Sequence, residues 1–368
     1  MGRLSLAGGL VSLAGAGVNL VRAVGLLGIV LASDRAAPVI AWAAEPSAVG
    51  EVQDLLQISS GDRRRLVQGE VVSYPVSENS ERELAAGMAM LVPAPLRQVA
   101  DYLASGQLIT QDATIVEFGM LASETPAAFL AGARYTGGER GEAESFLEAS
   151  AGTHFNLSVD EIEALRALKD SSAGSRVGAV ERASATYARF LGERLEAYRR
   201  AGLGGIAPYA RSGGSIRDPA IDLRSAAGDA ERLARYGQAI APTLLRYPAD
   251  PAPQMANSFY WIKRRIQRRP HLSLLHRIVV PGSGPVLHVE RYYYSGHSFN
   301  ATEILTGALA HPDGTLVFST SRTSTDEVLG MGNQLKRTIG RSQMRDEIRA
   351  RLDRLRASFS RPVTVESP

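Results

Sequence analysis

Residues 286–323, VLHVERYYYSGHSFNATEILTGALAHPDGTLVFSTSRT, decide the fold class of this chain. They contain three runs rich in β-branched and aromatic residues, separated by turn-forming residues such as HPDG at 311–314. Together with the preceding HLSLLHRIVV, these runs predict an antiparallel meander of four strands. The predicted strands are 271–280, 286–295, 299–309 and 315–323.

A long basic helix is predicted to follow the meander. Ser324 and Glu327 form a capping box, and apolar residues then recur at helical spacing as far as Phe359. Residues 333–361 carry nine Lys or Arg and three Asp or Glu, which suits the solvent face of such a helix. The sequence therefore predicts an amphipathic C-terminal helix over 333–361.

Strand and helix patterns also precede the meander. Residues 66–76 and 84–92 predict strands, and Pro93-Ala94-Pro95 predicts a helix over 95–104. The composition of 136–144 predicts a loop.

Residues from about 156 to 248 then become helical in pattern. A capping box at Ser158 and Glu161 and a proline-led start at Asp218-Pro219 mark helix beginnings. The proline-rich YPADPAP that follows is the best internal boundary. The predicted helices include 159–169, 177–201 and 229–246.

These patterns predict an α+β chain in five parts. The parts are a signal peptide (1–44), the N-terminal part of the α+β domain (45–155), a helical insertion (156–255), an antiparallel β meander (256–332) and the C-terminal amphipathic helix (333–361).

The first 44 residues differ from the rest of the chain. Residues 4–32 are nearly all small or apolar, and Ala41-Trp42-Ala43 supplies the small residues that a signal peptidase requires. We therefore expect export, with the mature protein in the periplasm. Because Arg22 interrupts the apolar run, an uncleaved membrane anchor and a start codon placed too early remain as alternatives.

Composition excludes several kinds of chemistry. The 368 residues include no cysteine, so disulfides, thiolate nucleophiles and cysteine metal sites are excluded. The six histidines form no His-Glu-x-x-His or His-x-His pattern, so we expect no metal site, and we expect no cofactor. No G-x-S-x-G element marks a nucleophilic serine.

Charge is unevenly spread along the chain. Residues 45–255 carry 21 Lys or Arg and 28 Asp or Glu, whereas 256–361 carry 17 and 8. We expect the basic part to meet an anionic membrane surface through Arg264, Arg265 and Arg341, or else to be an arginine-rich solvated surface. The FYWIKRR stretch suits an interfacial anchor, or a solvated edge strand or turn. No nucleic-acid-binding motif occurs, so we expect no nucleic acid partner.

Tyrosines at 292–294 suggest where a ligand would bind. Strand alternation predicts that Tyr292 and Tyr294 lie on one face, together with His288 and Glu290. Tyrosine offers both apolar surface and a hydroxyl, so these residues either line a cavity or form an aromatic core. Arg322, at the end of the last strand, either binds an acidic ligand group or pairs with Asp326. The candidate ligand-binding residues are Tyr292, Tyr294, His297 and Arg322.

Three stretches of the second half resemble a family of bacterial, predicted-exported proteins with no assigned activity. They are RFLGERLEAYRRAGLGGIAPYAR (189–211), HVERYYYSGHSFNATEILTGAL (288–309) and LVFSTSRTSTDEVLGMGNQLKRTIGRSQMRDEI (316–348). The order of predicted elements is also similar to the START-like helix-grip fold, in which a curved sheet wraps the last helix around an apolar cavity. That resemblance implies a helix-grip-like antiparallel sheet with a long C-terminal helix and a helical insertion.

Three functions fit these patterns. The first is non-enzymatic binding of a hydrophobic or amphipathic ligand, such as a lipid, between the sheet and the C-terminal helix. The second is a hydrolase that uses His297 with Glu290 or Asp326. The third is a module that binds a membrane surface or a partner. No motif assigns a catalytic residue, so the sequence favours the first.

Overall fold

The computed structural model describes residues 46–121, 130–171, 177–228, 244–249, 255–280 and 286–360. All of them lie in the second of two compact units, Ile40–Pro368. The predicted signal peptide and most of the predicted helix 229–246 lie outside the described residues. Among the helices that the structure describes, none has the length and apolar character needed to cross a membrane.

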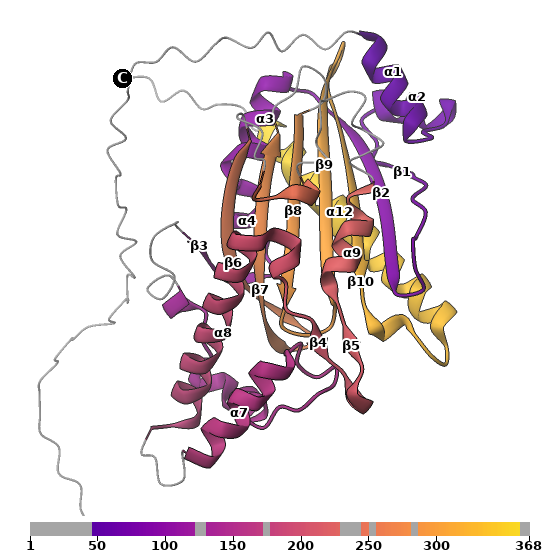
Figure 1. The fold of residues 1–368 in the computed structure, drawn as a ribbon. Helices are drawn as coiled ribbons and strands as arrows, with labels where there is room; N and C mark the ends of the chain where they lie inside the picture. The colour runs from indigo at the N-terminus through magenta and orange to yellow at the C-terminus, as the bar shows by residue number, and fades with distance from the viewer. Residues whose placement is uncertain are drawn as a thin grey trace, which may run out of the picture. The chain divides into compact units, whose positions relative to one another are not determined.

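An eight-stranded antiparallel sheet forms the centre of the described part of the chain (Figure 1). The strand order is β1-β2-β10-β9-β8-β7-β6-β3, so the last five strands of the chain are neighbours in sequence and in space. The strands are β1 (Val72–Tyr74), β2 (Glu83–Val92), β3 (Ile115–Leu121), β6 (Ala256–Ile266), β7 (Arg269–Val280), β8 (Val286–Ser295), β9 (Ala301–His311) and β10 (Gly314–Ser324).

Helices cover both faces of this sheet (Figure 1). On one face, which we call the α12 face, lie α3 (Leu96–Ser105), α4 (Gln107–Thr110) and α12 (Asn333–Ser360). On the other, which we call the α9 face, lie α1 (Pro46–Leu55), α2 (Ser60–Val67), α6 (Arg140–Leu147), α7 (Val159–Ser171), α8 (Ala179–Ala201) and α9 (Pro219–Ala226). A short hairpin of β4 (Tyr209–Ala210) and β5 (Ile216–Arg217) precedes α9.

The predicted α+β class is therefore confirmed, with its antiparallel sheet, its long C-terminal helix and its helical insertion. The predicted meander is present as β7 to β10, and α3, α7 and α8 lie within two residues of their predicted bounds. The capping box at Ser158 and Glu161 is also present, since each backbone N–H donates to the other residue's side chain, at 2.8 and 3.2 Å.

Strand β6 lies in a more buried environment than its composition predicts. The FYWIKRR stretch is neither an interfacial anchor nor a solvated edge, because it lies in β6, between β3 and β7. The strand accommodates Lys263, which is 2% exposed, by pairing its Nζ with Glu139 at 2.6 Å. β6 then turns into β7 through Gln267 and Arg268, whose positive φ angles of 51° and 69° fit a two-residue hairpin.

Three other boundaries also differ from prediction. The predicted strand 66–76 is divided between α2 and β1, and the predicted loop 136–144 contains the start of α6. Thr325, rather than Ser324, caps the turn after β10, by accepting from the N–H of Glu327. That turn ends at Val328, and α12 begins only at Asn333.

A β-bulge in β8 changes the face that one tyrosine occupies. The pairing of β7 with β8 shifts by one residue at Tyr293, and the extra residue reverses the alternation after it. Tyr294 therefore points to the α9 face, where its hydroxyl lies 3.0 Å from that of Tyr187 in α8. The prediction that Tyr292 and Tyr294 share a face is therefore wrong. The pattern of residue types does not reveal a bulge, so simple alternation was assumed.

Candidate functional site

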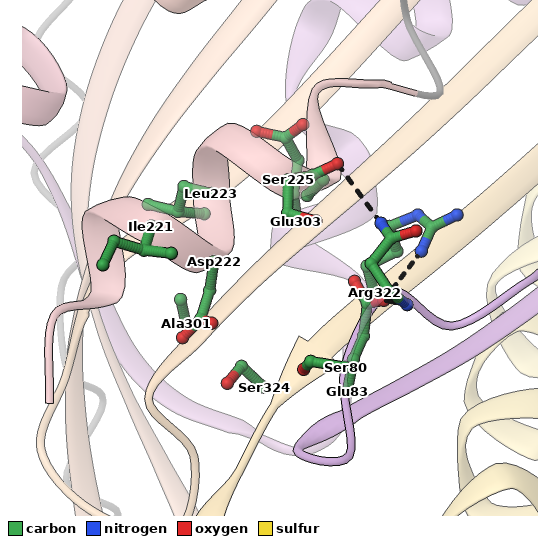
Figure 2. A pocket seen from close by; sticks show the side chains of 12 residues that line it. Ser80, Glu83, Ile221, Asp222, Leu223, Ser225, Ala301, Glu303, Arg322 and Ser324 are labelled. Carbon is green, nitrogen blue, oxygen red and sulfur yellow. Dashed lines mark hydrogen bonds and ion pairs between the residues drawn. The ribbon is translucent and has the colours of Figure 1, made fainter.

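A polar pocket lies on the α9 face, where α9 packs against β9 and β10 (Figure 2). We call it the α9 pocket, and its volume is about 130 Å³. Three parts of the chain that are far apart in sequence form it: the loop before β2, α9, and the ends of β9 and β10. Its lining residues are Asn79, Ser80, Glu83, Ile221, Asp222, Leu223, Ser225, Ala226, Ala301, Glu303, Arg322 and Ser324.

The local sequence explains how α9 presents its side chains. Asp218 accepts a hydrogen bond from the N–H of Ala220 at 2.9 Å, and Pro219 occupies the first helical position, as predicted. Leu223 and Ala226 bury the apolar side of the helix against the sheet. Asp222, on the same short helix, lines the pocket and is held by an ion pair with Arg217 of β5.

Arg322 and Glu83 form one wall of the pocket. Nη1 of Arg322 donates to Oε2 of Glu83 at 3.0 Å, and to the carbonyl oxygen of Ser77 at 2.9 Å. The two charged side chains are only 5% and 8% exposed. Neighbouring strands β2 and β10 therefore hold a buried ion pair beside the pocket, and Figure 2 shows it pointing towards the loop before β2.

Glu303 forms the floor of the pocket with support from behind. Nε of Arg291 donates to Oε2 of Glu303 at 2.7 Å, and Nη1 of Arg291 donates to the carbonyl oxygen of Leu244 at 2.8 Å. Arg291 is fully buried and Glu303 is 5% exposed. A negative charge is thus held at low exposure next to the cavity.

Asp222 differs from the other two carboxylates. Nη2 of Arg217 pairs with its Oδ1 and also donates to the hydroxyl of Ser324 at 3.0 Å. Oδ2 of Asp222 is buried, and no hydrogen-bond partner for it exists among the described residues. Burial raises the pKa of Asp222, Arg217 and the hydroxyl of Ser324 oppose the rise, and the Asp326 carboxylate adds to it. Since an unpartnered buried acceptor is costly, a hydrogen-bond donor entering the pocket would be stabilised there.

The remainder of the lining is apolar or carries hydroxyls. Leu223, Ala226 and Ala301 supply buried apolar surface, and Ile221 at the rim is 57% exposed. Among the lining residues, three carry a carboxylate and one carries a guanidinium. The arrangement suits a small group that donates hydrogen bonds, with an apolar portion directed towards Ile221.

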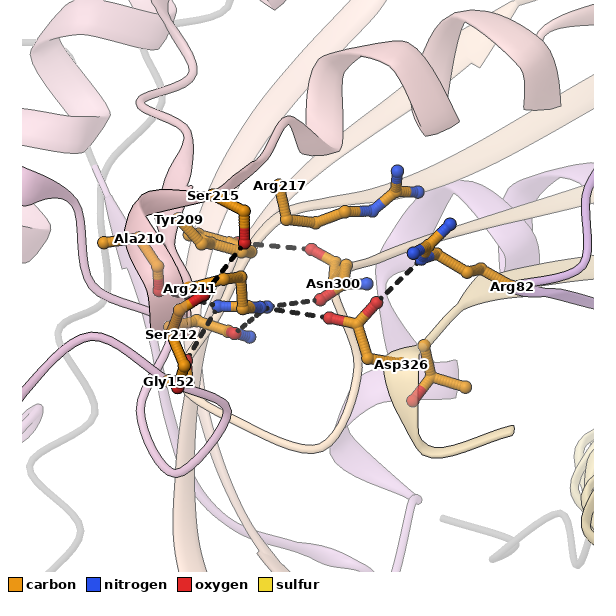
Figure 3. Close-up of polar contacts among 12 residues, drawn as sticks. Arg82, Gly152, Tyr209, Ala210, Arg211, Ser212, Ser215, Arg217, Asn300 and Asp326 are labelled. Atoms are coloured by element: carbon orange, nitrogen blue, oxygen red, sulfur yellow. Dashed lines mark hydrogen bonds and ion pairs between the residues drawn. The ribbon is translucent and has the colours of Figure 1, made fainter. Parts of the chain in front are cut away.

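A second cluster next to the pocket holds its parts in place (Figure 3). Arg211 donates to Asp326 at 3.0 Å, to the amide oxygens of Asn156 and Asn300 at 2.8 Å each, and to the carbonyl of Gly152 at 3.0 Å. Nε of Arg82 donates to the other oxygen of Asp326 at 3.0 Å.

This cluster joins the helical insertion to one end of the sheet, where β2 and β9 begin and β10 ends. Burial alone would raise the pKa of Asp326, but the hydrogen bonds and charges of Arg211 and Arg82 lower it below its ordinary value. Asp326 is therefore ionised and paired with Arg211 and Arg82, whereas Arg322 pairs with Glu83.

The predicted ligand-binding residues do not converge on one site. Tyr292 lies on the α12 face, where its hydroxyl accepts from Nη2 of Arg264 at 2.9 Å. Tyr294 lies on the α9 face against α8. His297 lies in the turn after β8, and only Arg322 lines the α9 pocket. Their ligand-binding role remains a prediction.

On the α12 face, charged side chains occupy the middle of the contact between sheet and helix. Glu290 accepts from Arg351 through both carboxylate oxygens, at 2.6 and 2.8 Å. Burial would raise the pKa of Glu290, but Arg351 lowers it to about 2. Nε of Arg277 donates to Nε2 of His288 at 2.6 Å, and burial lowers the pKa of His288 to about 3, so this ring is neutral.

His297 is paired differently from the expected acid–base pair. Its Nδ1 lies 2.7 Å from the hydroxyl of Ser298, and its Nε2 lies 3.2 Å from the carbonyl oxygen of Pro270. Burial lowers the pKa of His297 to about 4. Glu290 and Asp326 instead bind arginines, as described above.

The arginines that were expected to meet a membrane are placed in three different environments. Arg264 binds Tyr292, and Arg341 pairs with Glu78 at 2.7 Å. The side chain of Arg265 is 59% exposed and lies 4.0 Å from a carboxylate oxygen of Glu139. Each of the three therefore has a partner within the fold, and their role at a membrane stays a prediction.

The sequence did not reveal the acids of the α9 pocket. The one available signal for Glu303 is a carboxylate within an otherwise apolar and threonine-rich strand, which favours a buried partner. Nothing in the sequence connects it with Asp222 or with Glu83. Within the described ranges, no group of histidine or acidic residues has a geometry that could hold a metal ion.

Comparisons with known proteins add little to this geometry. No protein-family model matches the chain, and no curated protein matches it. Among solved structures the chain is similar to the crystal structure of the di-domain ARO/CYC StfQ from the steffimycin biosynthetic pathway, with 12% sequence identity. The similarity covers 76% of this chain and 97% of that chain, with a TM-score of 0.24, and carries no argument about function.

Proposed function

We propose that this protein binds a small amphipathic amine in the α9 pocket, without catalysing a reaction on it. The observation that carries the proposal is Oδ2 of Asp222, a buried atom in the wall of the pocket for which no donor lies in hydrogen-bonding geometry among the described residues. An ammonium group would supply both the missing donor and a positive charge.

Three features favour an amine over other donors. Of the three carboxylates that line the pocket, Glu83 and Glu303 are each bound by a buried arginine, whereas Asp222 keeps one oxygen for a donor, and at low exposure its attraction to a cation is weakly screened. A volume of about 130 Å³ accommodates a head group rather than a whole lipid. The apolar surface that ends at Ile221 suits an alkyl chain. The ligand class therefore stays amphipathic, as the sequence suggests, but the site moves from the α12 face to the α9 face.

The test uses three ligands that differ only in their polar end: n-pentylamine, n-pentanol and pentanoate, titrated by isothermal calorimetry. We expect the amine to bind most tightly, the alcohol more weakly, and the acid weakest. Asp222→Asn removes the charge but keeps the size, and we expect it to weaken amine binding about tenfold or more. Asp160→Asn, at an exposed position of α7, is the matched control. Tightest binding by pentanoate, or equal amine binding by Asp222→Asn, would exclude the proposal.

The pH dependence of binding provides a second check. Because the pKa of Asp222 is raised, this carboxyl keeps its proton to a higher pH than an ordinary aspartate does, and a protonated carboxyl attracts an ammonium less. We expect the affinity for n-pentylamine to increase as pH rises through the pKa of Asp222. In Asp222→Asn this increase should be absent.

A hydrolase remains a second candidate because of one contact. The hydroxyl of Ser298 lies 2.7 Å from Nδ1 of His297, and Ser298 has a positive φ of 67°, which is strained for a serine. If Nε2–H donates to Pro270, Nδ1 is free to accept the hydroxyl proton. A fluorophosphonate probe should then label the protein, and Ser298→Ala should not be labelled. No labelling of the wild type would remove this candidate.

Export and family membership are further proposals, supported by the sequence alone. The apolar segment 4–32 and Ala41-Trp42-Ala43 support secretion to the periplasm, within the bacterial family of predicted-exported proteins that the second half resembles. N-terminal sequencing of the protein from its host tests the export proposal. A mature chain that begins near Ala44 supports it, and a chain that begins at Met1 contradicts it.

A further inference from the structure

The two halves of α12 meet the rest of the protein in different ways. From Met344 onwards, Met344, Ile348, Leu352 and Leu355 are buried in the cluster that the sheet and α3 form with this helix, and we call the part before Met344 the first half. In the first half, nearly every side chain is exposed or only partly buried. Figure 1 shows these first turns at the lower right of the view, beside the start of β2.

Ion pairs, rather than apolar packing, fix the first half to the body. Arg337 and Arg341 both pair with Glu78, and Arg337 also donates to the carbonyl oxygen of Glu83 at 3.1 Å. Gly340 faces Leu84 so closely that a Cβ would lie 2.5 Å from a Leu84 methyl group. The side of the helix that carries these residues is therefore fixed against the sheet.

The opposite side carries a stripe of large apolar residues. Met331 is 96% exposed, Leu335 is 66% exposed and Ile339 is 49% exposed. They are four residues apart, and that spacing puts Leu335 and Ile339 side by side on the helix, with Met331 in the turn just before it. Exposed apolar residues that are grouped in this way, rather than scattered singly, mark an interaction surface.

Cations flank the stripe. Lys336, Arg345 and Arg349 are exposed, and none of them forms an ion pair with an acidic residue in the described part of the chain. Asp346 is the exposed acid on the same side of the helix. Apolar residues bordered by unpaired cations match the interface between headgroups and acyl chains of an anionic membrane. A second copy of the chain would bring more of the same cations and leave them unpaired.

We propose that Met331, Leu335 and Ile339, with Lys336, Arg345 and Arg349 around them, form a docking surface for anionic lipid membranes. These residues differ from the arginines that the sequence suggested for this role. The inference does not depend on the α9 pocket, because none of these residues lines it.

The experiment is flotation of the full chain with two kinds of vesicle, phosphatidylcholine alone and phosphatidylcholine mixed with phosphatidylglycerol. We expect the protein to float with the mixed vesicles, and to lose most of that binding at high salt, because salt screens surface charges. The double variant Leu335→Glu/Ile339→Glu should lose about tenfold or more of its affinity for the mixed vesicles. It lacks the apolar contacts, and its added negative charges repel the anionic lipid. Lys336→Glu/Arg345→Glu should bind the mixed vesicles poorly.

Val159→Glu is the matched control, because Val159 is 51% exposed on a helix of the α9 face. It should float like the wild type. All substituted side chains are exposed, and circular dichroism should show that each variant folds. Absence of flotation by the wild type would overturn the proposal, as would equal flotation by Leu335→Glu/Ile339→Glu. So would a dimer in sedimentation velocity that this double variant abolishes, since the stripe would then bind a second copy.

Discussion

Two acid–arginine pairs, one on each face of the sheet, have the same chemistry and opposite behaviour. On the α12 face, Arg351 binds both oxygens of Glu290, and the pKa of Glu290 is lowered to about 2 despite its burial. On the α9 face, Arg217 binds one oxygen of Asp222, the other has no partner among the described residues, and burial raises the pKa of Asp222.

The difference separates a structural ion pair from a binding site. A buried charge whose hydrogen bonds are all made inside the protein has nothing left to offer a ligand. A buried carboxylate with one oxygen that accepts no hydrogen bond lowers the stability of the fold until a ligand supplies a donor. The Glu290–Arg351 pair therefore stabilises the contact between α12 and the sheet, whereas Asp222 on the α9 face can still accept a hydrogen bond from a ligand.

The largest expected effect comes from breaking the completed pair. Arg351→Met leaves Glu290 buried without its counter-ion, and we expect a loss of about 3–5 kcal/mol in the free energy of unfolding. Urea denaturation followed by circular dichroism measures it. Arg345→Met, on the exposed side of the same helix, should change stability by less than about 0.5 kcal/mol. If Arg351→Met were as stable as this control, the Glu290–Arg351 pair would not stabilise the fold.

A smaller loss is expected from the cluster that joins the insertion to the sheet. Arg211→Met removes hydrogen bonds to Asp326, Asn156 and Asn300, and we expect it to cost about 2–3 kcal/mol. It should also weaken n-pentylamine binding, because Asp326 and Asn300 adjoin the pocket residues. Arg224→Met, at an exposed position of α9, is the control. Unchanged stability in Arg211→Met would show that the insertion is held by other contacts.

The two faces should also respond to pH in opposite directions. Burial lowers the pKa of His288 from 6.5 to about 3, so its contribution to stability is complete above pH 6.5 and is lost as pH falls towards 3. Glu290, whose pKa falls from 4.5 to about 2, adds a loss below pH 4.5.

The raised pKa of Asp222 gives a contribution that is present below its ordinary value of 3.8 and is lost as pH rises through its folded value. Urea midpoints measured across the acid range should therefore fall less steeply with acid in His288→Gln than in the wild type. They should fall more steeply in Asp222→Asn. Identical slopes in all three proteins would contradict both assignments.

The smallest effect on stability is expected at the binding face. Asp222→Asn removes a carboxylate that is costly to bury, but also loosens its pair with Arg217, so the net change should be within about 1 kcal/mol. Thermal denaturation without ligand measures it. With saturating n-pentylamine, the wild type should gain stability and the variant should not. A large loss without ligand would make Asp222 a structural residue like Glu290.

Local patterns in the sequence were enough for most of the fold. The meander, α3, α7, α8 and α12 follow from short-range periodicity, turn residues and caps, which act over a few neighbouring positions. β6 was misjudged because its aromatic and basic composition suits a surface, whereas Lys263 is buried through a partner at Glu139, more than a hundred residues away. The face of Tyr294 was wrong because one inserted residue in the pairing reverses everything after it.

The candidate site was harder to predict than the fold. Arg322 lies near the end of its strand, as predicted, but its neighbours in the pocket, Glu83, Asp222 and Glu303, come from three other elements, and its ligand-binding role stays a prediction. Only tertiary packing brings them together, and each acid taken alone resembles an ordinary surface charge. The sequence instead favoured Tyr292 and Tyr294 as ligand-binding residues. In the structure the rings of Tyr292, Tyr293 and Tyr294 pack against helices on the two faces of the sheet.

The binding role of Asp222 is decided by a crystal structure of the wild type grown with n-pentylamine. We expect an ammonium nitrogen within hydrogen-bond distance of Oδ2 of Asp222 and an alkyl chain along Ile221, in keeping with a loss of affinity of about tenfold or more in Asp222→Asn. An amine bound on the α12 face beside Glu290, or an α9 pocket without amine at saturating concentration, would contradict that role.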